Sequence, residues 1–151
     1  MRVPYAGHVE HDEAVSLIRS AAPQPAGTWA DLGAGSGVFT RALAELLGAG
    51  GMVYAVDRKP RSIAAAPGAA PTEVIQADFT EPLPFTELDG VLMANALHFV
   101  RRQARVLAGI VATLKSGGRF ILVEYDLERG TPWIPFPVPP RRFAELAEEV
   151  G

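Results

Sequence analysis

One stretch of the chain, Ala30–Thr40, combines an acid with three glycines in a pattern that can bind a ligand. Asp31 stands two residues before Gly33, and glycine recurs at the alternate positions Gly35 and Gly37. A strand-like run precedes these glycines and a helix-like run follows them. Glycines at such a turn let bare backbone N–H groups approach an anionic or polar ligand at the start of the helix. The stretch therefore predicts a ligand-binding loop.

The spacing of the glycines narrows the choice of ligand. Dinucleotide-binding loops favour G-x-G-x-x-G, whose third small residue lets the helix pack closely. Here that third position is Val38, and an acid precedes the glycines. D-x-G-x-G-x-G resembles the first motif of the class I S-adenosylmethionine-dependent methyltransferases. The resemblance implies S-adenosyl-L-methionine as cofactor, with Asp31 organising the loop and the methionine end through hydrogen bonds. The cofactor-binding residues that it implies in this loop are Asp31, Gly33, Ala34, Gly35 and Gly37.

Later segments match the same family in order. Asp57 ends a strand-like run about twenty residues after the last glycine, where the resemblance implies an acid that accepts both ribose hydroxyls, with Arg58 beside it. Asp78 ends the next run and is expected to receive the adenine amino group, while the backbone N–H of Phe79 meets a ring nitrogen. The segment Asn95–Phe99 is similar to that of small-molecule methyltransferases of the ubiquinone/menaquinone-biosynthesis type, and Asn95 is expected to contact the cofactor. Leu114–Arg119 resembles the turn into the family's fifth strand.

The resemblance implies direct, in-line methyl transfer, in which the protein mainly aligns the reacting atoms and excludes water. His98 is the best candidate for a general base, because it follows the fourth strand at the ligand-binding edge of the sheet. Its alternative roles are to position substrate or simply to pack. Methyltransferases that act on amino groups of bases carry a Pro-Pro-aromatic motif here, which Asn95–Phe99 lacks. The expected acceptor is therefore a small molecule rather than a nucleic acid.

Runs of strand and helix character alternate along the chain, which predicts an α/β fold with a parallel sheet. The resemblance implies that this sheet is doubly wound, with the strand order 3-2-1-4-5. The resemblance also implies a Rossmann-like methyltransferase fold without its usual last two strands. The chain is then expected to be either a truncated piece of a longer protein, which is favoured, or a naturally reduced domain. We expect one domain, 1–151, made of an N-terminal helical cap (1–27), a cofactor-binding core (28–125) and a proline-rich connector with the last helix (126–151). The expected strands are Thr28–Leu32, Met52–Val56, Glu73–Ala77, Asp89–Ala94 and Phe120–Tyr125. The expected helices are His11–Ala21, Val38–Leu47, at most a short one in Arg58–Pro71, Arg101–Leu114 and Arg141–Val150.

Composition agrees with this interpretation. A chain of 151 residues suits one domain, and a net charge of −3 argues against a broad nucleic-acid-binding surface. The chain has no cysteine, which excludes thiol chemistry and disulfides. The N-terminus lacks the apolar core of a signal peptide, and no apolar run approaches the roughly eighteen residues that span a bilayer. A cytoplasmic protein without membrane or nucleic-acid partners is expected.

Several features carry alternatives. His8, His11 and Asp12 include metal-ligand types, although a polar surface is the simpler interpretation, and no metal is expected. Tyr5 is expected either to close over the cofactor or to pack. Thr131–Pro140 is a stiff connector or a wall of the substrate site. The apolar fifth strand has few edge defences, so either the chain self-associates there or Trp133–Pro140 covers the edge.

Two other functions compete with methyl transfer. One is a cofactor-binding or scaffold domain of the same fold without catalysis, which the missing final strands favour. The other is an NAD-binding oxidoreductase domain, which Val38 and the acid before the glycines disfavour.

Overall fold

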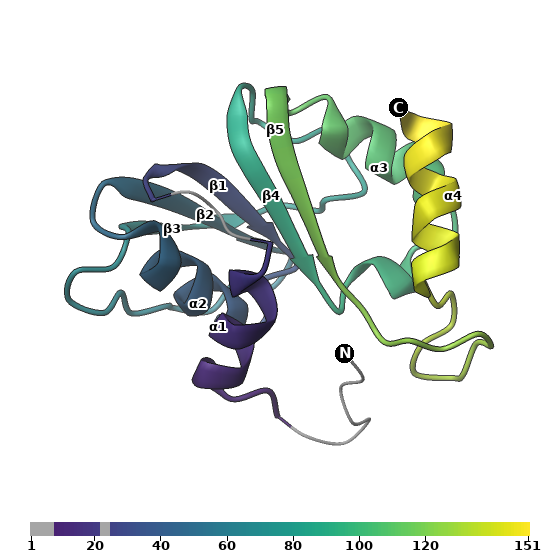
Figure 1. The fold of residues 1–151 in the computed structure, drawn as a ribbon, viewed down its shortest axis with the longest axis horizontal. Coiled ribbons are helices and arrows are strands. Elements are labelled where there is room, and N and C mark those ends of the chain that lie inside the picture. The colour runs from purple at the N-terminus through teal and green to yellow at the C-terminus, as the bar shows by residue number, and fades with distance from the viewer. Residues whose placement is uncertain (1–7, 22–24) are drawn as a thin grey trace.

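The central element of the fold is a five-stranded parallel sheet in the order β3-β2-β1-β4-β5 (Figure 1). The computed structural model describes residues 8–21 and 25–151, so the proposal for Tyr5 lies outside the described residues. The observed strand order confirms the prediction. The strands are β1 (Gly27–Leu32), β2 (Gly51–Asp57), β3 (Thr72–Gln76), β4 (Leu88–Ala94) and β5 (Leu114–Val123).

Helices cover both faces of the sheet. On one face, Trp29 packs in a cluster with residues of α1 and α2, and on the other Ala30 and Leu32 pack with residues of α3 and α4 (Figure 1). Neighbouring residues of a strand point to opposite faces, so a strand apolar at consecutive positions can serve both layers. This arrangement confirms the doubly wound α/β class. The helices are α1 (His11–Arg19), α2 (Val38–Leu47), the short 3₁₀ helix η1 (Leu97–Phe99), α3 (Gln103–Val111) and α4 (Pro140–Val150).

The register of the strands brings three chain segments together at one edge. β1 pairs with β2 from Gly27↔Gly51 to Leu32↔Val56, and its other side pairs with β4. The carboxyl ends of parallel strands lie at the same edge, so the residues that follow β1, β2 and β4 meet there.

Arg58–Pro71, where at most a short helix was predicted, forms none, because its prolines remove backbone donors and Gly68 takes a left-handed conformation with φ +78°. The predicted fifth strand differs from the structure. β5 begins at Leu114 rather than Phe120 and ends at Val123. The expected turn, Leu114–Arg119, lies inside β5 and interrupts its regular pairing with β4. Leu88 of β4 pairs with Leu114, but Gly90, two residues later, pairs with Arg119.

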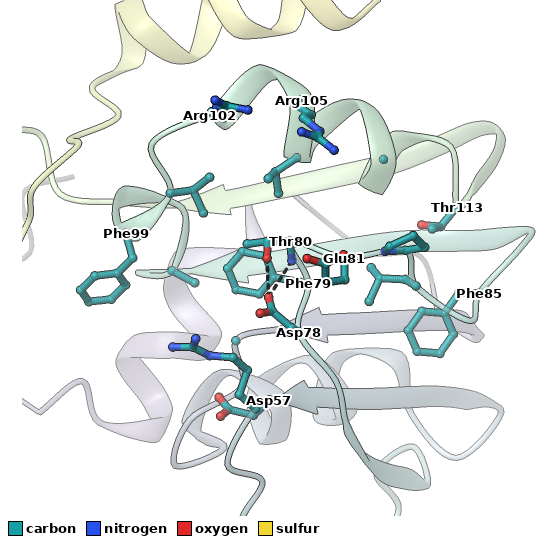
Figure 2. A pocket seen from close by; sticks show the side chains of 18 of the residues that line it. Asp57, Asp78, Phe79, Thr80, Glu81, Phe85, Phe99, Arg102, Arg105 and Thr113 are labelled. Atoms are coloured by element: carbon teal, nitrogen blue, oxygen red, sulfur yellow. Dashed lines mark hydrogen bonds between the residues drawn. The ribbon is translucent and has the colours of Figure 1, made fainter.

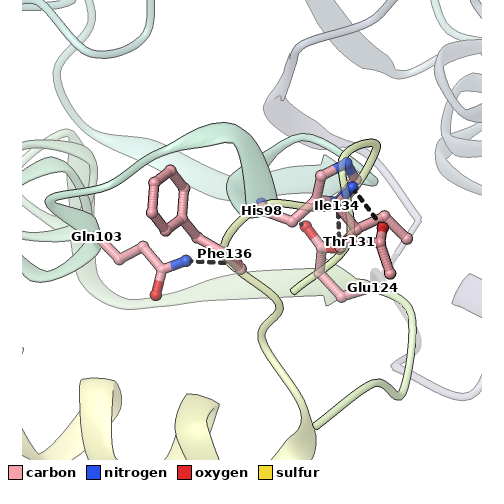
Figure 3. Close-up of polar contacts among 6 residues, drawn as sticks. All are labelled: His98, Gln103, Glu124, Thr131, Ile134 and Phe136. Carbon is pink, nitrogen blue, oxygen red and sulfur yellow. Dashed lines mark hydrogen bonds and ion pairs between the residues drawn. The ribbon is translucent and has the colours of Figure 1, made fainter. Parts of the chain in front are cut away.

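The proline-rich segment lies between β5 and α4 in the chain and is hydrogen-bonded to η1 and α3 (Figure 3). The N–H of Phe136 donates to the His98 carbonyl at 3.0 Å, and the Gln103 amide donates to the Phe136 carbonyl at 2.9 Å. Ile134 is buried, while Trp133 is 72% exposed. The segment is therefore anchored by these hydrogen bonds and by a buried aliphatic side chain, and it adds no strand to the sheet beside β5. That Trp133–Pro140 covers the edge of β5 stays a prediction.

Self-association of the chain stays a prediction. Within the described residues, β5 pairs with β4 and has no strand on its other side. Among the described helices, none is long and apolar enough to cross a membrane.

Packing between β1 and β4 predicts that Gly90→Ala destabilises the fold. Trp29 is paired with Gly90 across these strands, its ring is buried, and an added Cβ would come within 2.4 Å of ring carbons. We expect a loss of about 1–3 kcal/mol in the free energy of unfolding, measured by urea denaturation.

Gly109→Ala in α3 is the control, because an added Cβ there meets no atom within 4 Å. That change should stabilise by about 0.5–1 kcal/mol. Equal urea midpoints for Gly90→Ala and the unchanged protein would contradict this packing.

Candidate active site at the carboxyl edge of the sheet

Two adjoining cavities open at the carboxyl edge of the sheet. The larger has a volume of about 1010 Å³ and the smaller about 270 Å³. Gly33, Gly35 and Asn95 line both, so the glycine loop and the residue after β4 lie between them. Of the predicted cofactor residues, Asp57, Arg58, Asp78 and Phe79 line only the larger cavity (Figure 2), and Asp31 and Ala34 only the smaller.

The glycine loop has the conformation that its sequence predicts. Gly33, Gly35 and Gly37 all have positive φ, which favours glycine. A Cβ on Gly33 would lie 2.8 Å from the Ala96 Cβ, whereas one on Gly35 would find its nearest atom 4.0 Å away. Gly33 therefore allows close packing with the segment after β4, and Gly35 leaves open space at both cavities. Gly37 lines neither cavity and instead directly precedes α2.

Asp57 and Asp78 are held at the larger cavity by backbone donors. The Asp57 carboxylate accepts the N–H groups of Gly35 and Lys59, each at 2.9 Å, which ties the end of β2 to the glycine loop. Asp78 accepts the Thr80 hydroxyl at 2.7 Å and the Thr80 N–H at 2.9 Å (Figure 2). The hydroxyl bond is the main reason that the pKa of Asp78 lies below its ordinary value. Both acids thus present fixed oxygens to a ligand.

Asp31 and Asn95 each carry a buried oxygen with no hydrogen-bond partner among the described residues. One Asp31 oxygen accepts the Thr40 hydroxyl at 2.6 Å, and the other is the orphan. Burial raises the pKa of Asp31 to about 6; the bond from Thr40 opposes this rise, and the Asp57 carboxylate adds to it. Asn95 has the uncommon φ of +52°. Because buried polar atoms rarely lack partners, these two oxygens beside the smaller cavity indicate a ligand that donates hydrogen bonds.

His98 lies apart from these residues. Its side chain is 3% exposed and lines neither cavity. The ring Nδ1 lies 2.7 Å from one Glu124 oxygen, and the His98 N–H donates to the other at 3.1 Å (Figure 3). The structure therefore does not bring His98 to the predicted reaction face. Its base role stays a prediction, and the observed geometry is that of a side chain that holds η1 to the end of β5.

Sequence reasoning missed several residues that shape the site. Thr80 could have been found from spacing, since it lies two residues after Asp78, where a turn hydroxyl can reach the acid. Thr40 lies nine residues after Asp31, so that contact required the fold. His8 was considered as a metal ligand or, more simply, as polar surface, yet it lines the smaller cavity. His11 instead lies 2.5 Å from Glu45, and the described part of the chain holds no group of three acids or histidines placed to bind a metal.

The burial of Asp31 predicts an unusual dependence of stability on pH in the ligand-free protein. The folded state binds the Asp31 proton more tightly than the unfolded state, so the contribution of Asp31 to stability should fall as the pH rises from about 4 to above 6. The full effect is about 3 kcal/mol. Asp31→Asn removes the charge, so this variant should gain stability over the unchanged protein at pH 7.5 but not at pH 4.5, in urea denaturation. Asp78→Asn is the control, because the pKa of Asp78 is lowered and its loss should not stabilise at either pH. A pH-independent difference for Asp31→Asn would contradict the buried carboxylate.

Comparison with known proteins agrees with this geometry. A methyltransferase-domain family model matches residues 30–122. No curated protein sequence matches the chain. The chain has 22% identity to a TehB-like SAM-dependent methyltransferase from Corynebacterium glutamicum, over 96% of this chain and 74% of that one, with a TM-score of 0.63. It has 21% identity to 1,6-didemethyltoxoflavin-N1-methyltransferase from Burkholderia thailandensis, crystallised with 1,6-didemethyltoxoflavin and S-adenosylhomocysteine, over 93% and 66% of the two chains, with a TM-score of 0.68. A SAM-dependent methyltransferase from Aquifex aeolicus has 18% identity over 91% and 78%, with a TM-score of 0.66.

The structural likenesses are likenesses of fold, since all three identities are low, and this chain spans 66–78% of the three solved chains. The family model, in contrast, matches the sequence itself from the glycine loop to the end of β5. Because it covers more than half of the 151 residues, the chain belongs to the methyltransferase-domain family.

Proposed function

We propose that the chain transfers a methyl group from S-adenosyl-L-methionine to a small-molecule acceptor by direct in-line displacement. The main support for the proposal is a pair of buried oxygens without hydrogen-bond partners, Asp31 Oδ1 and Asn95 Oδ1, beside the glycine loop. The same loop also lines the larger cavity, together with the acids Asp57 and Asp78. An ammonium group is the donor that suits two such oxygens, and the methionine end of the cofactor carries one. The relative that acts on 1,6-didemethyltoxoflavin supports a small-molecule acceptor.

The chain would hold the cofactor across both cavities. In this proposal Asp57 binds the ribose hydroxyls and Asp78 with the Phe79 backbone binds the adenine, while Asp31 and Asn95 bind the methionine end. Support comes from the cavities that these residues line. When bound, S-adenosyl-L-methionine supplies a methyl group on a positively charged sulfur, which is already activated as an electrophile. The residues of the chain then have to orient this group and exclude water.

His8 is the residue we add to the methionine end. The methionine head carries a carboxylate close to its ammonium, so its site needs a donor as well as an acid. His8 lines the smaller cavity together with Asp31, and it is the imidazole on that wall. We propose that His8 donates to the carboxylate of the cofactor. For His98, the Glu124 contact occupies Nδ1 and leaves Nε2 for a base role, but the ring is buried and lines neither cavity, which supports positioning of η1.

The alternative, a domain that binds the cofactor without catalysis, makes the same binding predictions but differs in turnover. Transfer of tritium from S-adenosyl-L-[methyl-³H]methionine into a small-molecule extract separates the two. Label above the level of the Asp57→Ala variant supports the enzyme. Cofactor binding with label at the level of that variant supports the alternative.

Cofactor choice is tested by calorimetry. S-adenosylhomocysteine should bind and NAD should not bind comparably. Asp57→Ala should weaken binding by about 1–3 kcal/mol, because the ribose hydroxyls lose their acceptor and the Gly35 N–H loses its partner. The control is Glu73→Ala in β3, whose side chain lines neither cavity. Tight binding of NAD without S-adenosylhomocysteine would overturn the proposal.

The role of His8 is tested with a cofactor that lacks the carboxylate. The unchanged protein should prefer S-adenosylmethionine over decarboxylated S-adenosylmethionine by about tenfold, the size of one charge-assisted hydrogen bond. His8→Ala should remove most of this preference and His8→Lys should restore it, as measured by calorimetry at pH 6.5. His11→Ala should keep the preference, because His11 pairs with Glu45 instead. An unchanged preference in His8→Ala would exclude the contact.

A further inference from the structure

The larger cavity extends beyond the residues that are placed for the cofactor. From Asp57 and Asp78 it continues along α3 to Thr113. In Figure 2 Arg102 and Arg105 project from α3 on one side of this extension, and Thr80 and Glu81 lie across from them. The cavity volume of about 1010 Å³ lies at the upper end of the range of about 300–1000 Å³ for small-molecule pockets, and the residues expected to hold the cofactor line only one end of it.

The α3 side of the extension carries three arginines, Arg101, Arg102 and Arg105. None of their guanidinium groups has an ion pair or hydrogen bond in the part of the chain that the structure describes. They also lie at the N-terminal end of α3, whose first turn holds no acid. Cations at this end oppose the helix dipole, so the fold gains nothing from them there.

The start of α4 shows how the same chain treats arginines that are only part of the surface. Arg141 and Arg142 also lie at a helix start, but both pair with Glu145, at 3.3 and 3.4 Å. No such acid accompanies the arginines of α3. This contrast indicates that the positive charge at the start of α3 is left for a partner outside the chain.

The acids of the larger cavity do not neutralise this charge. Asp57 and Asp78 bind backbone N–H groups at the cofactor end, which leaves Glu81 as the other acid on the described wall. With Arg58, four guanidinium groups face three carboxylates in a protein whose net charge is −3. The extension therefore carries a local positive charge, although the net charge of the protein is negative.

Apolar side chains form the rest of the wall. Leu83, Phe85 and Val106 line the extension, and Phe85 and Val106 are buried within the core of that face. An anion without an apolar body would leave this wall uncovered, whereas an apolar body would bury it.

We propose that this extension binds a small molecule that combines an apolar body with a phosphate or carboxylate group, beside the cofactor and at the same time. The arginines of α3 bind the anionic group, since guanidinium forks suit both anions. The proposal goes beyond methyl transfer, because it requires only the cavity and its charges.

The test uses phenyl phosphate, benzoate and phenol as probes, titrated by calorimetry into the full chain saturated with S-adenosylhomocysteine at low ionic strength. Phenyl phosphate or benzoate should bind, and phenol should bind at least about tenfold more weakly, because it lacks the charge. Stronger binding of phenyl phosphate than of benzoate identifies a phosphate ligand, and the reverse identifies a carboxylate.

Two double variants locate the site. Arg102→Gln with Arg105→Gln should weaken binding of the anionic probe by about tenfold or more. Arg141→Gln with Arg142→Gln removes the same charge from the start of α4 and should leave probe binding within about twofold. Both variants should bind S-adenosylhomocysteine like the unchanged protein, which separates this proposal from the proposed function. Failure of both anions to bind, equal binding of phenol, equal losses in the two variants or competition with S-adenosylhomocysteine would each overturn the proposal.

Discussion

The parallel pairing of β1 with both β2 and β4 is the constraint on which the site depends. It fixes Asp31 at the end of β1 between the end of β2, which carries Asp57, and the end of β4, which is followed by Asn95. The hydrogen bond from Gly35 to Asp57 then adds a direct link between the glycine loop and β2. A ligand at this edge therefore meets groups from three strands whose relative positions are set by backbone hydrogen bonds, and little ordering is left for binding to accomplish.

This arrangement carries a cost in the ligand-free protein. Asp31 is buried with one oxygen unpaired, and its raised pKa is the direct sign that its charge is poorly solvated. A sequence selected for stability alone would place an apolar residue or an asparagine at this position. The retained acid is understandable if a cation completes the site, because the free energy lost in the empty state is then recovered on binding.

The sequence predicted those parts of the site that backbone geometry imposes. Gly33, Gly35, Asp57 and Asp78 were found because turn chemistry and strand ends leave short, readable patterns. The strand order followed from the family resemblance, and the register that aligns the strand ends came only with the structure. His98 follows β4 as the sequence indicated, but position in the chain says nothing about which way its side chain turns. Its direction is decided by Glu124, 26 residues later, through a contact that spacing cannot reveal.

The arginines at the start of α3 are a second example of what spacing in the sequence cannot predict. In the sequence, Arg101–Arg102 and Arg141–Arg142 are equivalent pairs at expected helix starts. Only the structure distinguishes them, because Glu145 lies one turn away from the second pair and a cavity lies beside the first. A local sequence pattern predicts residues whose role depends on their own backbone. Residues whose role depends on partners far along the chain can be identified only once the fold is known.

The contact of His98 with Glu124 also connects the proline-rich segment to the site. The His98 carbonyl accepts the Phe136 N–H, while its own N–H and ring bind Glu124, so one residue joins η1, the end of β5 and the segment that leads to α4. A buried polar network of this kind stabilises one arrangement only while every member is paired. Asn95, three residues before His98, has a left-handed backbone that needs such support to persist. The imidazole can therefore matter to function without touching a substrate, by holding in place the segment from which Asn95 faces both cavities.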